Sequence, residues 1–150
     1  MIRVLLVEDD AMIREMTRLF LESQKNFEVV CAASGTEALA CAQEKFDVIL
    51  LDILLPDTDG MQLCRTLRES HHCPIIFTSC LDDADTIVHA LELGGDDFLT
   101  KPYDNKILLA RILANVRRVQ MDAAEPVMQG YQCRAFQLDS DSRSVIREGK

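Results

Sequence analysis

Short apolar runs alternate along the chain with segments in which apolar residues recur every three or four positions. The runs predict strands at residues 3–7, 27–32, 48–51, 74–78 and 97–100. The periodic segments predict helices at residues 11–22, 35–44, 60–69, 84–93 and 105–119. Strands and helices that alternate in this way form a parallel sheet with helices on both faces. The pattern therefore predicts one α/β domain over residues 1–119, built on a five-stranded, doubly wound parallel sheet.

The helical periodicity is lost after residue 119. Residues 120–128, which include Pro126, are interpreted as a linker. Beyond it, residues 131–138 and 144–147 have the pattern of two strands around a turn-rich segment, which makes a short β-rich tail. So short a tail does not build a stable core by itself. We therefore expect residues 129–150 to be the start of a second domain that this chain does not complete.

Composition and charge narrow the class of protein. The chain has 16 Lys and Arg residues against 25 Asp and Glu residues, and its net charge of −9 argues against a broad nucleic-acid-binding face. Its most apolar stretch, residues 48–55, is interrupted by Asp52 and is far shorter than the roughly 20 residues of a membrane span. The chain opens directly on a strand-like run, and its six cysteines have no CxxC spacing. We therefore expect a cytoplasmic protein with reduced thiols and no membrane contact.

Acidic, hydroxyl and cationic side chains stand at the carboxyl ends of four predicted strands. Glu8 and Asp9 follow the first strand, Asp52 follows the third, Thr78 ends the fourth and Lys101 follows the fifth. Ligands of an open α/β sheet bind outside the carboxyl ends of its strands. We therefore expect these side chains to share one crevice.

Several carboxylates in one crevice repel one another, and the single Lys101 does not balance them. Oxygen ligands without a neighbouring Cys or His favour Mg²⁺ over Zn²⁺, and Mg²⁺ keeps positions open for water and phosphate oxygens. A carboxylate beside such an ion, a Lys and a hydroxyl has what phosphoryl transfer onto Asp requires. Each residue alone has a plainer interpretation, as a helix cap or a turn residue. Their joint placement at the ends of the right strands favours function.

With their neighbours, these residues resemble a known family. The motifs are Val7-Glu8-Asp9-Asp10, the segment DILLPDTDG at residues 52–60, Thr78-Ser79, and the segment GGDDFLTKPY at residues 94–103. They are similar to those of the response regulator receiver domain of bacterial two-component signalling, and the similarity runs from Ile2 to Arg118. The resemblance implies a flavodoxin-like fold and a sensor histidine kinase as the partner that supplies phosphate.

The resemblance also implies a metal site. Asp52 would be the phosphoacceptor. Asp9, Asp52 and the backbone carbonyl of Leu54 would bind Mg²⁺ directly, and Glu8 would bind it through water.

Further roles follow from the same resemblance. Thr78 and Lys101 would contact the phosphoryl group, and Phe98 occupies the aromatic switch position. Leu54 and Cys80 lie two residues past Asp52 and Thr78, where family members can orient a hydrolytic water. Neither side chain does this well, so we expect slow autodephosphorylation.

The resemblance narrows to the OmpR/PhoB-like subfamily, whose effector is a winged-helix DNA-binding domain. It implies homodimerisation through helix 84–93, strand 97–100 and helix 105–119. The residues of this expected dimer face are Ile87, Leu91, Asp96, Asp97, Ile107, Arg111 and Arg118. Asp97 would pair with Arg111 and Asp96 with Arg118, some of these across a two-fold axis. DNA would be bound only through the effector domain that is missing from this chain.

One position pair departs from that subfamily. Its members commonly set a cation on the fourth helix against an acid early in the fifth, whereas this chain has Ile87 and Ile107 there. We expect an apolar contact in place of the ion pair.

The main interpretation is a phosphorylation-activated transcription regulator, which is a signalling protein and not a metabolic enzyme. Two other functions compete with it. A phosphatase of the aspartyl-nucleophile type needs a second acid two residues after the nucleophile, and this chain has Leu54 there. A receiver-like interaction module that is not regulated by phosphate is the other alternative. The intact set of Asp9, Asp52, Thr78 and Lys101 argues against it.

Overall fold

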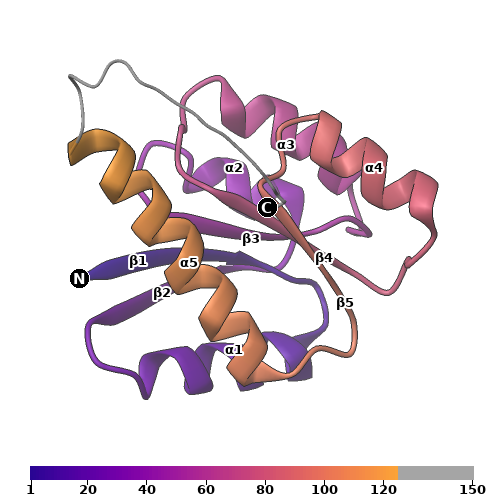
Figure 1. The fold of residues 1–150 in the computed structure, drawn as a ribbon. Helices are drawn as coiled ribbons and strands as arrows, with labels where there is room; N and C mark the ends of the chain where they lie inside the picture. The colour runs from indigo at the N-terminus through magenta and orange to yellow at the C-terminus, as the bar shows by residue number, and fades with distance from the viewer. Residues whose placement is uncertain (125–150) are drawn as a thin grey trace. The chain divides into compact units, whose positions relative to one another are not determined.

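A computed structural model of the chain describes residues 1–124 and divides the chain into two compact units, residues 1–117 and 118–150. The strands are β1 (Ile2–Val7), β2 (Phe27–Ala32), β3 (Val48–Asp52), β4 (Ile75–Ser79) and β5 (Asp97–Thr100). The helices are α1 (Ala11–Glu22), α2 (Gly35–Ala40), α3 (Gly60–Arg68), α4 (Ala84–Glu92) and α5 (Asn105–Ala124). The strands form one parallel sheet in the order β2-β1-β3-β4-β5 (Figure 1). The predicted doubly wound fold is confirmed.

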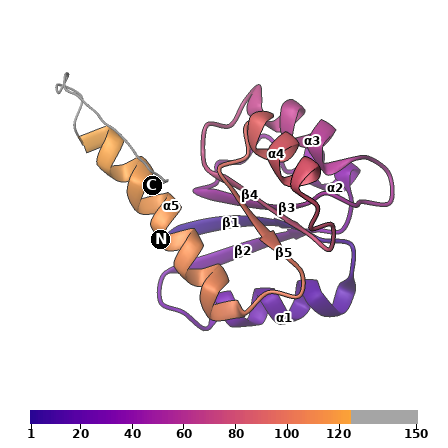
Figure 2. The same ribbon diagram turned by 45° about the vertical axis from the view of Figure 1, so that its right-hand side comes forward.

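The apolar runs of the central strands bury residues on both faces of the sheet. In β1, Leu5 and Val7 pack against α2, α3 and α4, whereas Val4 and Leu6 pack against α1 and α5. Successive strand residues point to opposite faces, so a strand with helices on both sides needs apolar residues throughout. This is why β3 and β4 have no buried–exposed alternation. Figure 2 shows the sheet between its two helical layers.

Short-range signals set where the helices begin. Asp10, Ser34, Asp59 and Asp83 are the N-caps of α1, α2, α3 and α4, and each side chain accepts a hydrogen bond from a backbone amide of the first turn. These residues satisfy donors that the helix itself leaves unpaired. The helices therefore begin where the sequence predicts.

Helix α2 is shorter than expected, because it ends at Ala40 and not near Glu44. The reason is tertiary. Arg3 binds the carboxylate of Glu44 at 2.8 Å and the carbonyl of Lys45 at 2.9 Å, and the carbonyl of Glu44 faces His71 Nε2 at 3.0 Å. These contacts hold residues 44–45 against Arg3 of β1 and against His71, and the backbone between Ala40 and Glu44 makes tight i→i−3 turns in place of α-helix.

Helix α5 is longer than expected and includes residues 120–124, which were expected to lie in the linker. No Gly or Pro occurs between Asn105 and Ala124, and the first residue that breaks a helix is Pro126. The remaining linker residues and the expected second-domain segment 129–150 lie outside the described residues. Within the described part of the chain, no helix is both long and apolar enough to cross a membrane.

Candidate functional site

The acidic and cationic residues singled out in the sequence meet at the carboxyl end of the sheet. Glu8 directly follows β1, Asp52 is the last residue of β3, and Lys101 directly follows β5. Asp52 lies opposite Thr78 in the β3–β4 register. The strand order changes direction between β1 and β3, which is where a doubly wound sheet opens a crevice for a ligand. Topology therefore brings together residues that are far apart in the sequence.

Lys101 joins two of these acids. Its Nζ lies 2.7 Å from Asp52 Oδ2 and 2.6 Å from Glu8 Oε1. The side chains are almost fully enclosed, with exposed fractions of 13% for Lys101, 4% for Asp52 and 1% for Glu8. Burial tends to lower the pKa of Lys101, but the contacts with Asp52 and Glu8 outweigh it and raise that pKa above its usual value. The lysine is therefore held in its charged form.

Glu8 is the acid of this group whose charged form is least favoured by its surroundings. Burial is the main cause that raises its pKa, and the nearby charge of Asp52 adds to the shift, while Lys101 opposes it. Glu8 Oε2 accepts a hydrogen bond from Asp10 N at 3.2 Å. Among the described residues, Glu8 Oε1 has the ion pair with Lys101 Nζ at 2.6 Å and no further hydrogen-bond partner. One buried carboxylate oxygen thus depends on the single ammonium of Lys101, which Asp52 shares, to offset its loss of water.

These carboxylates can hold a divalent cation. One oxygen each from Glu8, Asp9 and Asp52 can be chosen so that all lie within 4.8 Å of one another, and Asp9 is exposed to solvent. The donor set is all oxygen, which suits a hard ion, and the unsatisfied Glu8 Oε1 is a second sign of a cation site. Together with Leu54, Cys80 and Lys101, these residues line an open pocket of about 570 Å³. A small phosphorylated group has room there.

Two expected switch residues lie on neighbouring strands. Thr78 is buried within β4 and is the direct register partner of Asp52 across the sheet. Phe98 in β5 is half-buried, and its ring lies 6.5 Å from that of Phe77, tilted by 35°. Thr78 thus lies beside Asp52 in the sheet, and the switch roles expected for Thr78 and Phe98 stay predictions.

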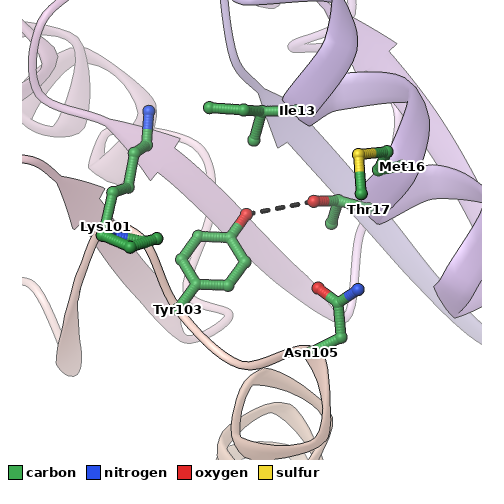
Figure 3. A pocket seen from close by; sticks show the side chains of 7 residues that line it. Ile13, Met16, Thr17, Lys101, Tyr103 and Asn105 are labelled. Atoms are coloured by element: carbon green, nitrogen blue, oxygen red, sulfur yellow. Dashed lines mark hydrogen bonds between the residues drawn. The ribbon is translucent and has the colours of Figure 1, made fainter.

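Tyr103 and Thr17 are site neighbours to which the sequence analysis gave no role. Their hydroxyl oxygens lie 3.1 Å apart in a hydrogen bond that joins the β5–α5 loop to α1 (Figure 3). They line a small cavity of about 190 Å³ with Lys101, Ile13 and Met16. Tyr103 follows Lys101-Pro102 in the quoted motif, but its partner is 86 residues away in the sequence, so no local pattern indicates the contact.

The expected dimer-face residues lie on α4, β5 and α5. Leu91 is 41% and Ile107 50% exposed, and Ile87 is half-buried. Asp97 pairs with Arg111 at 2.6 Å within the chain.

Asp96 makes contacts with α3 and β4 that the sequence pattern did not indicate. Asp96 Oδ2 lies 2.6 Å from Arg68 and accepts the backbone N–H of Ile75 at 2.9 Å, which ties it to the end of α3 and the start of β4. Arg118 belongs to the second compact unit, so its expected pairing with Asp96 stays a prediction.

Comparisons with known proteins find relatives of this chain. The sequence profile of the response regulator receiver domain matches residues 4–113. The chain is 43% identical over 116 residues to the transcriptional regulatory protein CseB of Streptomyces coelicolor, an alignment that covers 77% of this chain and 49% of CseB. The chain thus spans about half the length of the curated relatives it matches.

Solved structures give the same result. A two-component response regulator from Clostridium difficile superposes with a TM-score of 0.76 at 33% identity, covering 79% of this chain and 98% of that one. The BeF3-activated receiver domain of RstA from Klebsiella pneumoniae superposes with a TM-score of 0.71 at 35% identity, covering 77% and 98%.

Proposed function

The chain belongs to the response regulator receiver domain family, and from this premise we propose that Asp52 accepts a phosphoryl group from a sensor histidine kinase. The observation that carries the proposal is the enclosure of Asp52 between Lys101, at 2.7 Å, and the acidic cluster of Glu8 and Asp9. An oxygen of Asp52 forms a bond to phosphorus as the P–N bond of the kinase phosphohistidine breaks. The electron pair of that bond stays on the imidazole nitrogen.

Mg²⁺ is the cation we propose for this site. Asp9, Asp52 and the carbonyl of Leu54 would hold it directly and Glu8 through water, and when bound it supplies positive charge to the phosphoryl oxygens. The ammonium of Lys101 neutralises a further phosphoryl oxygen, because it already lies at the carboxylate that is to be phosphorylated. The hydroxyl of Thr78 donates a hydrogen bond to an oxygen of the phosphoryl group.

The response to phosphorylation passes through the sheet. The added charge and oxygens draw Thr78 toward Asp52, which gives Phe98 room to rotate inward from its half-buried position beside Phe77. The surface formed by α4, β5 and α5 changes as a result. The change is a shift of population between two states of one fold.

We propose that this surface forms a homodimer when Asp52 is phosphorylated. Exposed Leu91 and Ile107 and half-buried Ile87 supply apolar area, and Asp97 and Arg111 supply opposite charges. Transcription is the output by analogy with the name of CseB. DNA binding would belong to an effector domain that begins within residues 129–150.

The phosphoryl group is expected to be long-lived. Leu54 and Cys80 line the pocket beside Asp52, and both are exposed to the solvent from which a hydrolytic water would come. Neither side chain is a strong hydrogen-bond acceptor that could orient that water. A half-life of seconds for the phosphorylated chain would contradict this.

Incubation with acetyl phosphate and Mg²⁺, followed by intact-mass analysis, tests the proposal. We expect one phosphoryl group per wild-type chain, and none when Mg²⁺ is chelated or when Asp52→Asn is used. If D52N still takes up a phosphoryl group, the acceptor is a residue other than Asp52. A wild-type chain that takes no phosphate would favour the alternative function, an interaction module that phosphate does not regulate.

A further inference from the structure

The loop between β3 and α3, residues 53–59, connects the acidic cluster to the rest of the fold. Leu54 N donates a hydrogen bond to Asp52 Oδ1 at 3.1 Å, so the loop backbone fixes one carboxylate oxygen. At the base of the loop, Gly60 N donates to Ile53 O at 2.7 Å, and Leu54 and Asp59 form an isolated antiparallel bridge. A side chain at Gly60 would clash with the backbone of Asp52. The base is therefore closed by backbone contacts at the end of β3.

The tip of the loop is held by Asp57. Its Oδ1 accepts a hydrogen bond from Gly35 N at 2.8 Å, and its Oδ2 accepts from Thr36 N at 2.9 Å and from the Thr36 hydroxyl at 2.6 Å. All three donors stand at the start of α2, more than 20 residues earlier in the chain. The two segments approach closely, since a side chain at Gly35 would clash with Thr58. The tip thus has a fixed place that the base alone does not give it.

Helix α2 does not need Asp57 as its cap. Ser34 is the N-cap, and its hydroxyl accepts a hydrogen bond from Glu37 N at 3.1 Å. Glu37 Oε1 in turn accepts a hydrogen bond at 2.8 Å from Ala33 N, one residue before the N-cap, and so ties the helix to the residue that precedes it. The bonds from Asp57 come in addition to this cap, and they connect two elements that the cap leaves independent.

Asp57 is suited to this task electrostatically. The hydrogen bonds from the Thr36 hydroxyl and from the Thr36 and Gly35 amides lower its pKa below the usual value for Asp. The side chain is therefore an anion at neutral pH and accepts all three bonds together.

We infer that Asp57 is a positioning residue for the phosphorylation site, because it fixes loop 53–59 to α2 and so holds the Leu54 amide and carbonyl beside Asp52. This inference rests on the proposed function, which assigns the Leu54 carbonyl to Mg²⁺. Without Asp57 the loop loses its hydrogen bonds to α2 and keeps its backbone contacts at the base and the packing of Leu55 on the core. We expect the Leu54 carbonyl then to spend less time in the position that a metal requires. The expected consequence is a weaker metal site on a folded protein.

Titration of the ¹⁵N-labelled chain with Mg²⁺, followed by amide chemical shifts, tests this without any phosphorylation. We expect Asp57→Ala to raise the half-saturating Mg²⁺ concentration by roughly tenfold, as for loss of a partner that orients a ligand. Asp57→Asn keeps one acceptor oxygen and should have a smaller effect. Thr36→Val removes only the hydroxyl bond and should have the smallest.

Asp83→Ala is the matched control. Asp83 is another exposed carboxylate bound to a Thr amide and hydroxyl, those of Thr86 at 3.0 and 2.8 Å, but it stands at the start of α4 and not on the loop. We expect it to lower stability in urea without changing the half-saturating Mg²⁺ concentration. If D57A does not fold, the graded pair D57N and T36V carries the test.

Equal Mg²⁺ affinity in the wild type, D57N and D57A overturns the inference, whatever their stability in urea. A wild type that binds Mg²⁺ but takes no phosphate overturns the proposed function and leaves the inference to be judged by the titration. A wild type that binds no Mg²⁺ overturns both.

Discussion

Each end of the sheet has acidic side chains around one cationic side chain, but the two clusters differ in their exposure to solvent. At the amino end, Arg3 lies 3.2 Å from Glu28 and 2.8 Å from Glu44, and its guanidinium stands 5.1 Å from the centre of the Phe46 ring. At the carboxyl end, Lys101 lies 2.7 Å from Asp52 and 2.6 Å from Glu8. The ion-pair distances at the two ends are alike, so these distances do not distinguish the two clusters.

The difference lies in access to water. The paired side chains at the amino end are 30–49% exposed, whereas those at the carboxyl end are 1–13% exposed. Exposed charges are screened and contribute little, while buried charges cost much unless every one is neutralised. The amino end is therefore an exposed cluster of ion pairs that contributes modestly to stability. The carboxyl end is a buried cluster with excess negative charge, which can hold a further cation.

Removing the cation at the carboxyl end should have the largest effect. Lys101→Met leaves the buried carboxylates of Glu8 and Asp52 without their ammonium, and we expect the free energy of unfolding to fall by about 3 kcal/mol in the absence of Mg²⁺. Urea unfolding measures this, and adding Mg²⁺ should recover part of the loss. A loss no larger than that of Arg3→Met would show that the two ends do not differ.

Removing an acid at the carboxyl end should have the opposite sign. The pKa of Glu8 is raised mainly by burial, so the fold favours the protonated form, and the stability this gives below the unfolded pKa is lost as pH rises through the folded pKa. We therefore expect Glu8→Gln, without Mg²⁺, to be more stable than the wild type at pH 7, with the gain shrinking toward pH 4. Glu28→Gln at the amino end is the matched control. A gain from E8Q that does not depend on pH would refute the burial argument.

Removing the cation at the amino end should cost less. Arg3→Met breaks exposed ion pairs and the contact with Phe46, and we expect a measurable loss of stability at low ionic strength that is smaller than the loss from Lys101→Met. The loss should shrink in about 1 M salt, because screening acts on exposed charges. Urea unfolding at the two salt concentrations measures it. A loss that salt leaves unchanged would mean that packing of the Arg3 stem on Phe46, and not charge, is what matters.

The expected dimer face gives the smallest effect and extends the comparison to association. We expect an apolar contact at Ile87 and Ile107 in place of an exposed ion pair, which leaves salt little to screen there. We expect the dimer dissociation constant of the phosphorylated chain to change by less than about threefold between low and high salt. Sedimentation at both ionic strengths measures this. A dimer that dissociates at high salt would assign the interface to charges such as Asp97 and Arg111.

The sequence predicted the sheet and the meeting of the acidic residues because both follow from local patterns and one topological rule. Strand periodicity located Asp52 and Lys101 at strand ends, and parallel strands bring their carboxyl ends to the same edge. The contacts of Asp96 with Arg68 and of Asp57 with Thr36 could not be predicted, since these residues lie 28 and 21 positions apart on different elements. The early end of α2 belongs to the same class, because Arg3 lies 41 residues before Glu44.

The sequence by itself determined which segments are buried, where helices begin, and which residues carry charge at the ends of strands, because each depends on a residue and its near neighbours. Only the tertiary structure decided how much water those charges meet. It encloses Lys101 with Asp52 and Glu8 and leaves Arg3 open, and it sets Asp57 against the start of α2. The energy of a charge depends on its surroundings more than on its identity, and elements distant in the chain supply those surroundings.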